Sequence, residues 1–203
     1  MSSRQYTFSR TAPASSWGVP RLSYISKTQY SEEWNSNLHT HGCAELFFIT
    51  DGHGRFRTQY EEFPVAIHDL VVVNANVLHT ELSQMDSPLE YIVLGVEGLE
   101  AVSAADGCTM LHLHSGWREL LNCLDLMLKE AREGRPGWEE LCGHLLGVVL
   151  ILMERQEDLS LAEESPDPRG SRECSLVRRY IDNHFKEDLS LDQLARLAHV
   201  NKY

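Results

Sequence analysis

Three histidines and one glutamate lie at a spacing that could bind a metal ion or a small molecule. His39, His41 and Glu45 have the same parity, and alternate residues of a β-strand share one face, so their side chains can point the same way. His79 would join them from a later strand. Imidazole and carboxylate groups suit a divalent metal ion, and they suit a polar pocket for a small molecule equally well. A third alternative for His39 and His41 is hydrogen bonding to neighbouring strands.

Length and composition indicate a globular protein with one core and a smaller unit. The chain has 203 residues, 42% hydrophobic content and a net charge of -12, which disfavours broad attraction to nucleic acid or anionic membranes. Its five cysteines include no C-x-x-C pair, as expected for reduced thiols. The N-terminus lacks an apolar signal segment, and Leu145–Met153 falls well short of the roughly 18 apolar residues of a membrane span. We expect a cytoplasmic protein with no membrane partner.

Residues 21–114 are predicted to form a barrel or sandwich of short strands, because apolar runs alternate with turn residues. Residues 97–109 are predicted to be a loop, and the sequence Asp51-Gly52-His53-Gly54 is typical of a hairpin turn. The strands are predicted at Arg21–Gln29, Ala44–Thr50, Arg55–Tyr60, Phe63–Ile67, Asp69–Val73, Leu78–Leu82, Leu89–Val96 and Leu111–His114.

Residues 115–157 are predicted to form two antiparallel helices. Apolar residues recur at helical spacing over Trp117–Ala131 and again over Trp138–Met153, and Gly134-Arg135-Pro136-Gly137 separates the two runs. The apolar face of the second helix is too wide for one side of a barrel to cover. We infer that it packs against its partner helix or against a second subunit, which predicts a homodimer. Internal packing without dimerisation is the alternative.

The remaining segments differ in character. Residues 1–20 are rich in Ser, Thr, Arg and Pro, and they predict either a disordered terminus or an arm that folds over a ligand or a neighbouring domain. Residues 158–173 are acidic and contain two prolines, as expected for a linker. Within 174–203, residues 176–185 predict an amphipathic helix, and Ser190 with Gln193 forms a capping-box pattern that predicts a second helix start.

The C-terminal segment resembles the start of the double helix-turn-helix DNA-binding domain of AraC-type transcription regulators. The barrel segment is similar to the cupin-type sensor domain of the same family. The matching residues are Tyr180-Ile181 through Phe185, Leu189-Ser190-Leu191, Leu194-Ala195 and Ala198 in the first, and His39-x-His41-x-x-x-Glu45, Gly52 and His79 in the second. The resemblance implies a mainly β fold with α: a cupin-like double-stranded β-helix or jelly-roll barrel, then an antiparallel helical hairpin and a truncated helix-turn-helix.

Two departures from the family pattern stand out. The sequence Ala66-Ile67-His68-Asp69 occupies the place of a frequent Pro-x-Gly-Asp, so that His68 replaces a glycine suited to the turn. The recognition helix and the second helix-turn-helix do not follow the first one in this sequence. Reading the major groove needs a recognition helix, so we expect this fragment to bind DNA weakly or not at all, and the full-length protein to bind it.

The resemblance implies the effector-sensing and dimerisation part of a transcription regulator rather than an enzyme. Its effector would be a small molecule, as sugars are for some family members, and a divalent metal ion is the candidate cofactor. The candidate ligand residues are His39, His41, Glu45 and His79, which are also the candidate metal ligands, with Tyr91 and Arg55 as neighbours. The alternative is a metal-dependent cupin enzyme, a dioxygenase or an isomerase.

Overall fold

The structure, a computed structural model, describes residues 2–7, 20–30, 37–101, 107–113, 115–156, 161–163, 181 and 190–197. The chain forms two compact units, Met1–Glu163 and Glu164–Tyr203, and each is described by itself. Among the described residues, no helix is long and apolar enough to cross a membrane.

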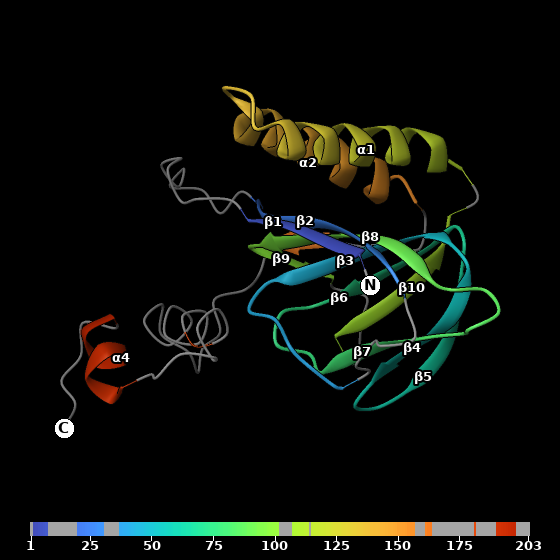
Figure 1. Cartoon of the computed structure of the whole chain (residues 1–203), viewed down its shortest axis with the longest axis horizontal. Coiled ribbons are helices and arrows are strands. Elements are labelled where there is room, and N and C mark those ends of the chain that lie inside the picture. Colours follow the sequence, from blue (N-terminus) through green and yellow to red (C-terminus); the bar gives the residue numbers. More distant parts are fainter. Residues whose placement is uncertain are drawn as a thin grey trace. The chain divides into compact units, whose positions relative to one another are not determined.

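Antiparallel sheets dominate the first unit (Figure 1). A large sheet has the order β1-β2-β8-β3-β6-β10, a second sheet has the order β5-β4-β7, and β9 pairs with β11. The strands are β1 (Ser2–Thr7), β2 (Arg21–Gln29), β3 (Ala44–Asp51), β4 (His53–Thr58), β5 (Glu62–Ala66), β6 (Asp69–Val73), β7 (His79–Ser83), β8 (Glu90–Glu97), β9 (Leu99–Ala101), β10 (Cys108–His112) and β11 (Leu161–Glu163).

The strands β3, β6 and β8 of the large sheet are buried on both faces. On β3, Leu46 and Phe48 belong to the core shared with the helices, whereas Phe47 and Ile49 belong to the core inside the barrel. Strands β6 and β8 divide their side chains in the same way. Both sets of alternate residues are therefore apolar, which explains why these strands read as continuous apolar runs. Glu45 shares the inward face with Phe47, so its carboxylate lies inside the barrel.

Helices α1 (Trp117–Glu133) and α2 (Trp138–Glu154) lie side by side over the outer face of the large sheet (Figure 1). Leu120, Leu124 and Met127 of α1 are fully buried, as are Cys142 and Val149 of α2. The first helix ends at Gly134, which adopts a φ of 61° and donates its N–H to the Glu130 carbonyl. Such a left-handed C-terminal glycine is a common helix stop. The predicted helical hairpin is confirmed.

The predicted hairpin at residues 51–54 is wrong. Strand β3 pairs with β6 and β8, whereas β4 pairs with β5 and β7, so the turn carries the chain from one sheet to the other. Gly52 has a φ of 71°, and a Cβ atom there would overlap the Pro88 carbonyl oxygen. The structure has the glycine turn that the sequence predicts, but a glycine-rich turn does not specify which strands pair.

Two further segments differ from expectation. Strand β9 lies within the predicted loop 97–109 and pairs with β11, which falls in the predicted linker. A partner so distant in the chain leaves no local signal for the strand. Residues Ser2–Thr7, predicted as part of an arm, form β1 along the edge of the large sheet. His68, in the place of the expected glycine, has a φ of 75° and so keeps the left-handed turn.

The second unit contains α4 (Leu191–Leu197). Ser190 Oγ accepts from the Gln193 backbone N–H at 3.3 Å, and Gln193 Oε1 accepts from the Ser190 backbone N–H at 2.9 Å. This reciprocal pair confirms the predicted capping box and helix start. The predicted helix over residues 176–185 lies outside the described residues, apart from Ile181 in a helical conformation.

The core between the sheet and the helices predicts a contrast between two residues of α1. Leu124 is fully buried, whereas Asn122 is exposed. Leu124→Ala should lower the free energy of unfolding by about 2–5 kcal/mol, because it leaves a cavity in packed apolar surroundings. Asn122→Ala is the control and should change it by less than about 1 kcal/mol. Urea denaturation of both variants provides the comparison, and equal losses would contradict this packing.

Candidate functional site

The four candidate residues converge at one end of the barrel. His39 forms an isolated bridge with His79, the first residue of β7, through backbone hydrogen bonds of 3.0 and 2.9 Å. This bridge holds the segment that carries His39 and His41 beside β7. One side-chain nitrogen from each of His39, His41 and His79 lies within 4.8 Å of the others. Glu45 reaches the same point from β3. Three imidazoles and a carboxylate thus surround one small volume.

Two of the histidine rings are oriented by the backbone. His39 Nδ1 lies 3.1 Å from the Asn37 carbonyl oxygen, and His79 Nδ1 lies 2.9 Å from the Val77 carbonyl oxygen. A carbonyl can only accept, so each Nδ1 carries the proton and donates it. In the neutral ring the lone pair then resides on Nε2. Histidine ligands of metals commonly have their other ring nitrogen fixed in this way.

The Glu45 carboxylate divides its two oxygens between different partners. Oε1 accepts a hydrogen bond from the Tyr24 hydroxyl, whereas Oε2 lies 3.0 Å from His79 Nε2 and 3.7 Å from His41 Nε2. Oε2 and His79 Nε2 form an ion pair, and neither has a further hydrogen-bond partner in the described part of the chain. Both buried atoms face a shared centre.

The charges of the site favour a neutral His39 and an ionised Glu45. Burial and the neighbouring His79 lower the pKa of His39. Burial alone would raise the pKa of Glu45, but His79, His41 and Tyr24 together lower it. Burial alone would lower the pKa of His79, but the carboxylates of Glu45 and Glu81 raise it overall. Burial raises the pKa of Tyr24 well above its ordinary value, so the phenol keeps its proton and donates.

A second polar group lies further along the barrel interior. Glu81 has an exposed fraction of only 2%, and its Oε2 has no hydrogen-bond partner among the described residues. Burial raises the pKa of Glu81 to about 7, with Glu45 adding to the rise and His79 opposing it. Tyr30 donates its hydroxyl to the Glu81 backbone oxygen. Tyr91 is also buried, and its ring packs edge-on against Phe47 with 5.4 Å between ring centroids.

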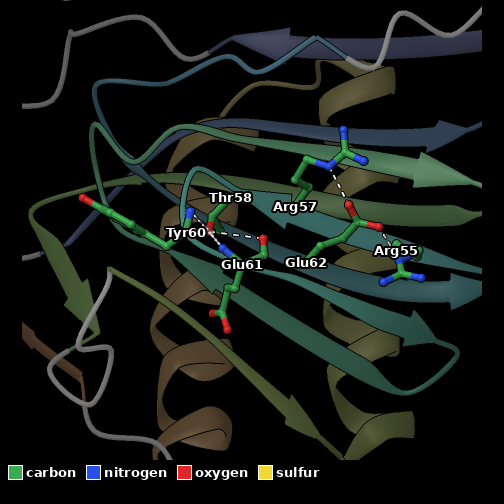
Figure 2. A network of polar contacts seen from close by, with 6 residues as sticks. All are labelled: Arg55, Arg57, Thr58, Tyr60, Glu61 and Glu62. Carbon is green, nitrogen blue, oxygen red and sulfur yellow. Dashed lines mark hydrogen bonds and ion pairs between the residues drawn. The ribbon is translucent and has the colours of Figure 1, made fainter.

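Arg55 is the one candidate that the structure does not bring to the site. It lies exposed on the outer face of β4 and pairs with Glu62, which also accepts from Arg57 Nε at 2.6 Å (Figure 2). Phe56, between the two arginines, is fully buried inside the barrel. Alternation along a strand places Arg55 and Phe56 on opposite faces, so the proposed place of Arg55 beside the pocket is corrected.

Sequence reasoning missed the polar side chains of β2. Tyr24, Ser26 and Thr28 alternate along the strand and Tyr30 follows its last residue; Ser26, Thr28 and Tyr30 are at least 92% buried. Tyr24 and Tyr30 reach Glu45 and Glu81. Hydroxyl-bearing residues at three alternate positions of one predicted strand, with a fourth just beyond its end, were the available signal, because a buried polar row needs partners. Glu81, two residues after His79 on the same strand, shares its face and was available by the same argument.

Histidines outside the cluster have other surroundings. His53 Nε2 lies 2.8 Å from Gln84 Oε1, and His112 Nδ1 lies 2.7 Å from Asp69 Oδ1. The ring of His68 contacts Trp117 at a centroid distance of 5.2 Å. His144 is exposed on α2. His114 and His184 lie outside the described residues.

The donor set fits a divalent metal ion. Nitrogen and oxygen donors of these types bind zinc, nickel, iron and similar ions, and the site offers three imidazoles, two of them oriented by backbone carbonyls, and one carboxylate oxygen. The buried Glu45 Oε2 and His79 Nε2 meet at the point of convergence and have no further hydrogen-bond partner among the described residues, which supports this fit. A barrel of antiparallel strands with this inward-facing centre defines a cupin-type protein.

The family is shown by sequence. A profile of the AraC-like ligand binding domain matches residues 26–147, and the chain belongs to this family. Its described first unit is accordingly the sensing domain of a regulator. No curated protein sequence matches the chain significantly.

Solved structures are similar to this chain at low sequence identity. Apo ToxT K231A from Vibrio cholerae strain SCE256 is 7% identical, with a TM-score of 0.50 over 88% of this chain and 71% of that chain. YhaK from Escherichia coli is 15% identical, with a TM-score of 0.45 over 57% of this chain and 52% of that chain. The bacterial pirin YhhW from Escherichia coli, in complex with nickel(II), is 13% identical, with a TM-score of 0.40 over 55% and 50%. The chain spans about half the length of YhaK and of YhhW.

The raised pKa of Glu81 predicts a dependence of stability on pH. Between about pH 4.5 and 7 the folded state keeps a proton on Glu81 that the unfolded chain releases, so raising the pH in this window favours unfolding. The loss reaches roughly 3 kcal/mol at neutral pH. Glu81→Gln should remove this part of the pH slope of the free energy of unfolding. Urea denaturation from pH 4.5 to 8 measures it. The exposed Glu154→Gln is the control, and an unchanged slope in Glu81→Gln would contradict the assignment.

Proposed function

We propose that this chain is the effector-sensing and dimerisation part of a DNA-binding transcription regulator. A small molecule bound inside the barrel would control how attached DNA-binding domains are presented. The observation that carries the proposal is the convergence of the buried pair Glu45 and His79 with His39 and His41 inside a barrel of the AraC-like ligand binding domain family. Buried ionisable groups gathered at one point are costly, and a bound ligand would offset part of that cost.

In this proposal each segment has one role. Residues 1–20 form an N-terminal arm, 21–114 form the ligand-sensing barrel, and 115–157 form the helical hairpin for dimerisation. Residues 158–173 link this part to 174–203, the start of the helix-turn-helix domain through which the full-length protein would bind DNA.

We propose a divalent metal ion as the first ligand of the cluster formed by His39, His41, Glu45 and His79. His39 and His79 would bind through Nε2, because their Nδ1 protons are held by backbone carbonyls. Glu45 would bind through Oε2. When bound, the metal would supply a Lewis-acid centre able to coordinate oxygen atoms of an effector.

The interior beyond the cluster supports a compact polar effector. Tyr91 and Glu81 bring a phenol and a carboxyl group to the barrel lining, and Glu81 Oε2 lacks a partner in the described residues. An effector with hydroxyl groups, of which a sugar is one class, would provide both donors and acceptors of hydrogen bonds for this carboxyl group. A purely apolar effector would leave these groups unsatisfied.

A metal-dependent enzyme, a dioxygenase or an isomerase, is the second candidate function. The three histidines favour it, because such a set leaves coordination positions open for a substrate. The two functions differ in the fate of the bound compound. A sensor returns its effector unchanged, whereas an enzyme converts it, so mass spectrometry of a stabilising compound after incubation with the metal-loaded protein separates them.

The ligand proposal predicts a specific response to divalent ions. Thermal melting and calorimetric titration of the metal-free protein should show one bound equivalent, with about 2.7 kcal/mol of stabilisation at 100 times Kd. His41→Ala should weaken binding, since it removes one donor. His53→Ala, outside the cluster, should bind as the wild type does. The same melting assay, repeated with metabolites in the presence of metal, screens for the effector. Equal binding by the wild type and His41→Ala would remove the cluster as the site.

A second copy of the chain is the proposed partner of α2. Leu141, Val148 and Ile151 of α2 are 37%, 44% and 52% exposed, and Leu126 of α1 is 39% exposed. An open hollow of about 420 Å³ lies among Leu126, Gly137, Glu140, Leu141, His144, Leu145 and Val148. A contiguous apolar surface of this kind is typical of an interface. Helix α2 therefore carries apolar residues beyond those that the sheet and α1 bury.

Dimerisation through α2 predicts that a charge on this surface separates the subunits. Val148→Glu keeps the fold because Val148 is exposed, but it places a carboxylate in an apolar interface. Light scattering coupled to size exclusion should give a dimer for the wild type and a monomer for the variant. Glu154→Lys, also exposed on α2, should remain dimeric. A monomeric wild type would exclude α2 as the interface.

A further inference from the structure

The carboxylate of Glu45 is reached by a tyrosine two strands away. Tyr24 on β2 is opposite Gly95 on β8, and Gly95 is opposite Glu45 on β3. The three residues thus form one row across three neighbouring strands. Adjacent strands lie about 4.8 Å apart, so Tyr24 has to extend across β8 to meet Glu45. Its hydroxyl donates to Glu45 Oε1.

Gly95 makes this crossing feasible. A Cβ atom at Gly95 would overlap the ring atoms Cδ1, Cε1 and Cζ of Tyr24. The aromatic ring therefore covers the bare backbone of Gly95, in space that any other residue would fill. Gly95 has no positive φ, so its lack of a side chain is needed for room and not for backbone conformation.

A β-bulge aims Tyr24 into the barrel. The register between β2 and β8 shifts between Leu22 and Tyr24, which leaves Ser23 as an extra residue. Because of this shift, Leu22 and Ile25 both face the core shared with the helices, although they are three positions apart. Tyr24 is then in phase with Ser26 on the inward face. Bulges commonly redirect a side chain towards a functional site.

The two carboxylate oxygens of Glu45 therefore have different partners. The phenol occupies Oε1, and the other oxygen remains directed at His79 Nε2 and His41 Nε2. The ring of Tyr24 also lies 6.2 Å from that of His41, centroid to centroid. Without the phenol, the carboxylate could rotate and offer both oxygens or neither.

We propose that Tyr24 is a positioning residue that makes Glu45 a ligand through Oε2 alone, and that Gly95 is required because it gives Tyr24 its path. This inference rests on the proposed metal site, and it assigns a role to two residues outside the ligand set. The role is distinct from packing, since it concerns which oxygen of Glu45 faces the histidines.

Cobalt(II) is the probe for the test, because its visible d–d absorption reports the number and geometry of its ligands. The metal-free wild type and Tyr24→Phe are titrated with Co²⁺, and affinity and spectrum are recorded. Tyr24→Phe should bind Co²⁺ about 10–100-fold more weakly, the usual effect of removing an outer partner of a ligand, and with an altered spectrum. Gly95→Ala should reproduce both changes, because its methyl group displaces the ring of Tyr24.

Tyr30→Phe is the matched control. It removes a single buried hydroxyl from the same face of the chain, but that hydroxyl donates to the Glu81 backbone oxygen and not to a ligand. Its Co²⁺ affinity and spectrum should equal those of the wild type. A role of Tyr24 in stability alone would lower the melting temperature and leave the Co²⁺ spectrum unchanged.

The possible outcomes distinguish the positioning role of Tyr24 from the proposed metal site on which it rests. If the wild type binds Co²⁺ and folded Tyr24→Phe shows the same affinity and spectrum, the positioning role is overturned and the metal site stands. If the wild type binds no Co²⁺, the metal site and the positioning role fall together. Should Tyr24→Phe not fold, Gly95→Ala provides the same comparison.

Discussion

A carboxylate buried between two sheets is the constraint on which this barrel depends. Removing a charge from water costs several kcal/mol unless partners compensate for it, so Glu45 needs neighbours that the chain must bring from distant positions. His79 comes from β7, His41 precedes β3, and Tyr24 comes from β2 across Gly95. Each partner lies on a different segment. The pairing of β2 with β8, of β8 with β3, and the bridge between His39 and His79 together set the geometry of one carboxylate.

The strands that hold the site also hold the helices. Along β3, Glu45 and Phe47 face the barrel interior, whereas Leu46 and Phe48 pack in the core shared with α1 and α2. A ligand that moved β3 would therefore displace side chains in both cores, because close-packed interiors transmit small shifts. The helical hairpin carries the apolar surface proposed for a second copy. One buried sheet thus provides a physical connection between a ligand in the barrel and the arrangement of two subunits.

Local signals in the sequence predicted much of this structure, and long-range pairing accounts for the misses. Period-two and helical patterns, the stop at Gly134 and the capping box at Ser190 are each encoded within a few residues, and the structure agrees with them. Parity placed His39, His41 and Glu45 on one face, and the structure brings them together with His79. The sheet change after Gly52 and the pairing of β9 with β11 depend on which strands meet, which local chemistry does not specify. The bulge before Tyr24 and the close approach of the Tyr24 ring to Gly95 also depend on which strands pair, so the sequence alone did not predict them.

We propose above all that the histidine cluster and Glu45 form a single ligand centre inside the barrel. X-ray absorption spectroscopy of the zinc-loaded protein tests this most directly, because the atoms bound to the metal are identified by type and number. We expect three imidazole nitrogens at about 2.0–2.1 Å and a single carboxylate oxygen at a similar distance. A sulfur shell near 2.3 Å, the distance of a cysteine thiolate, or a shell with fewer than three imidazoles would contradict it.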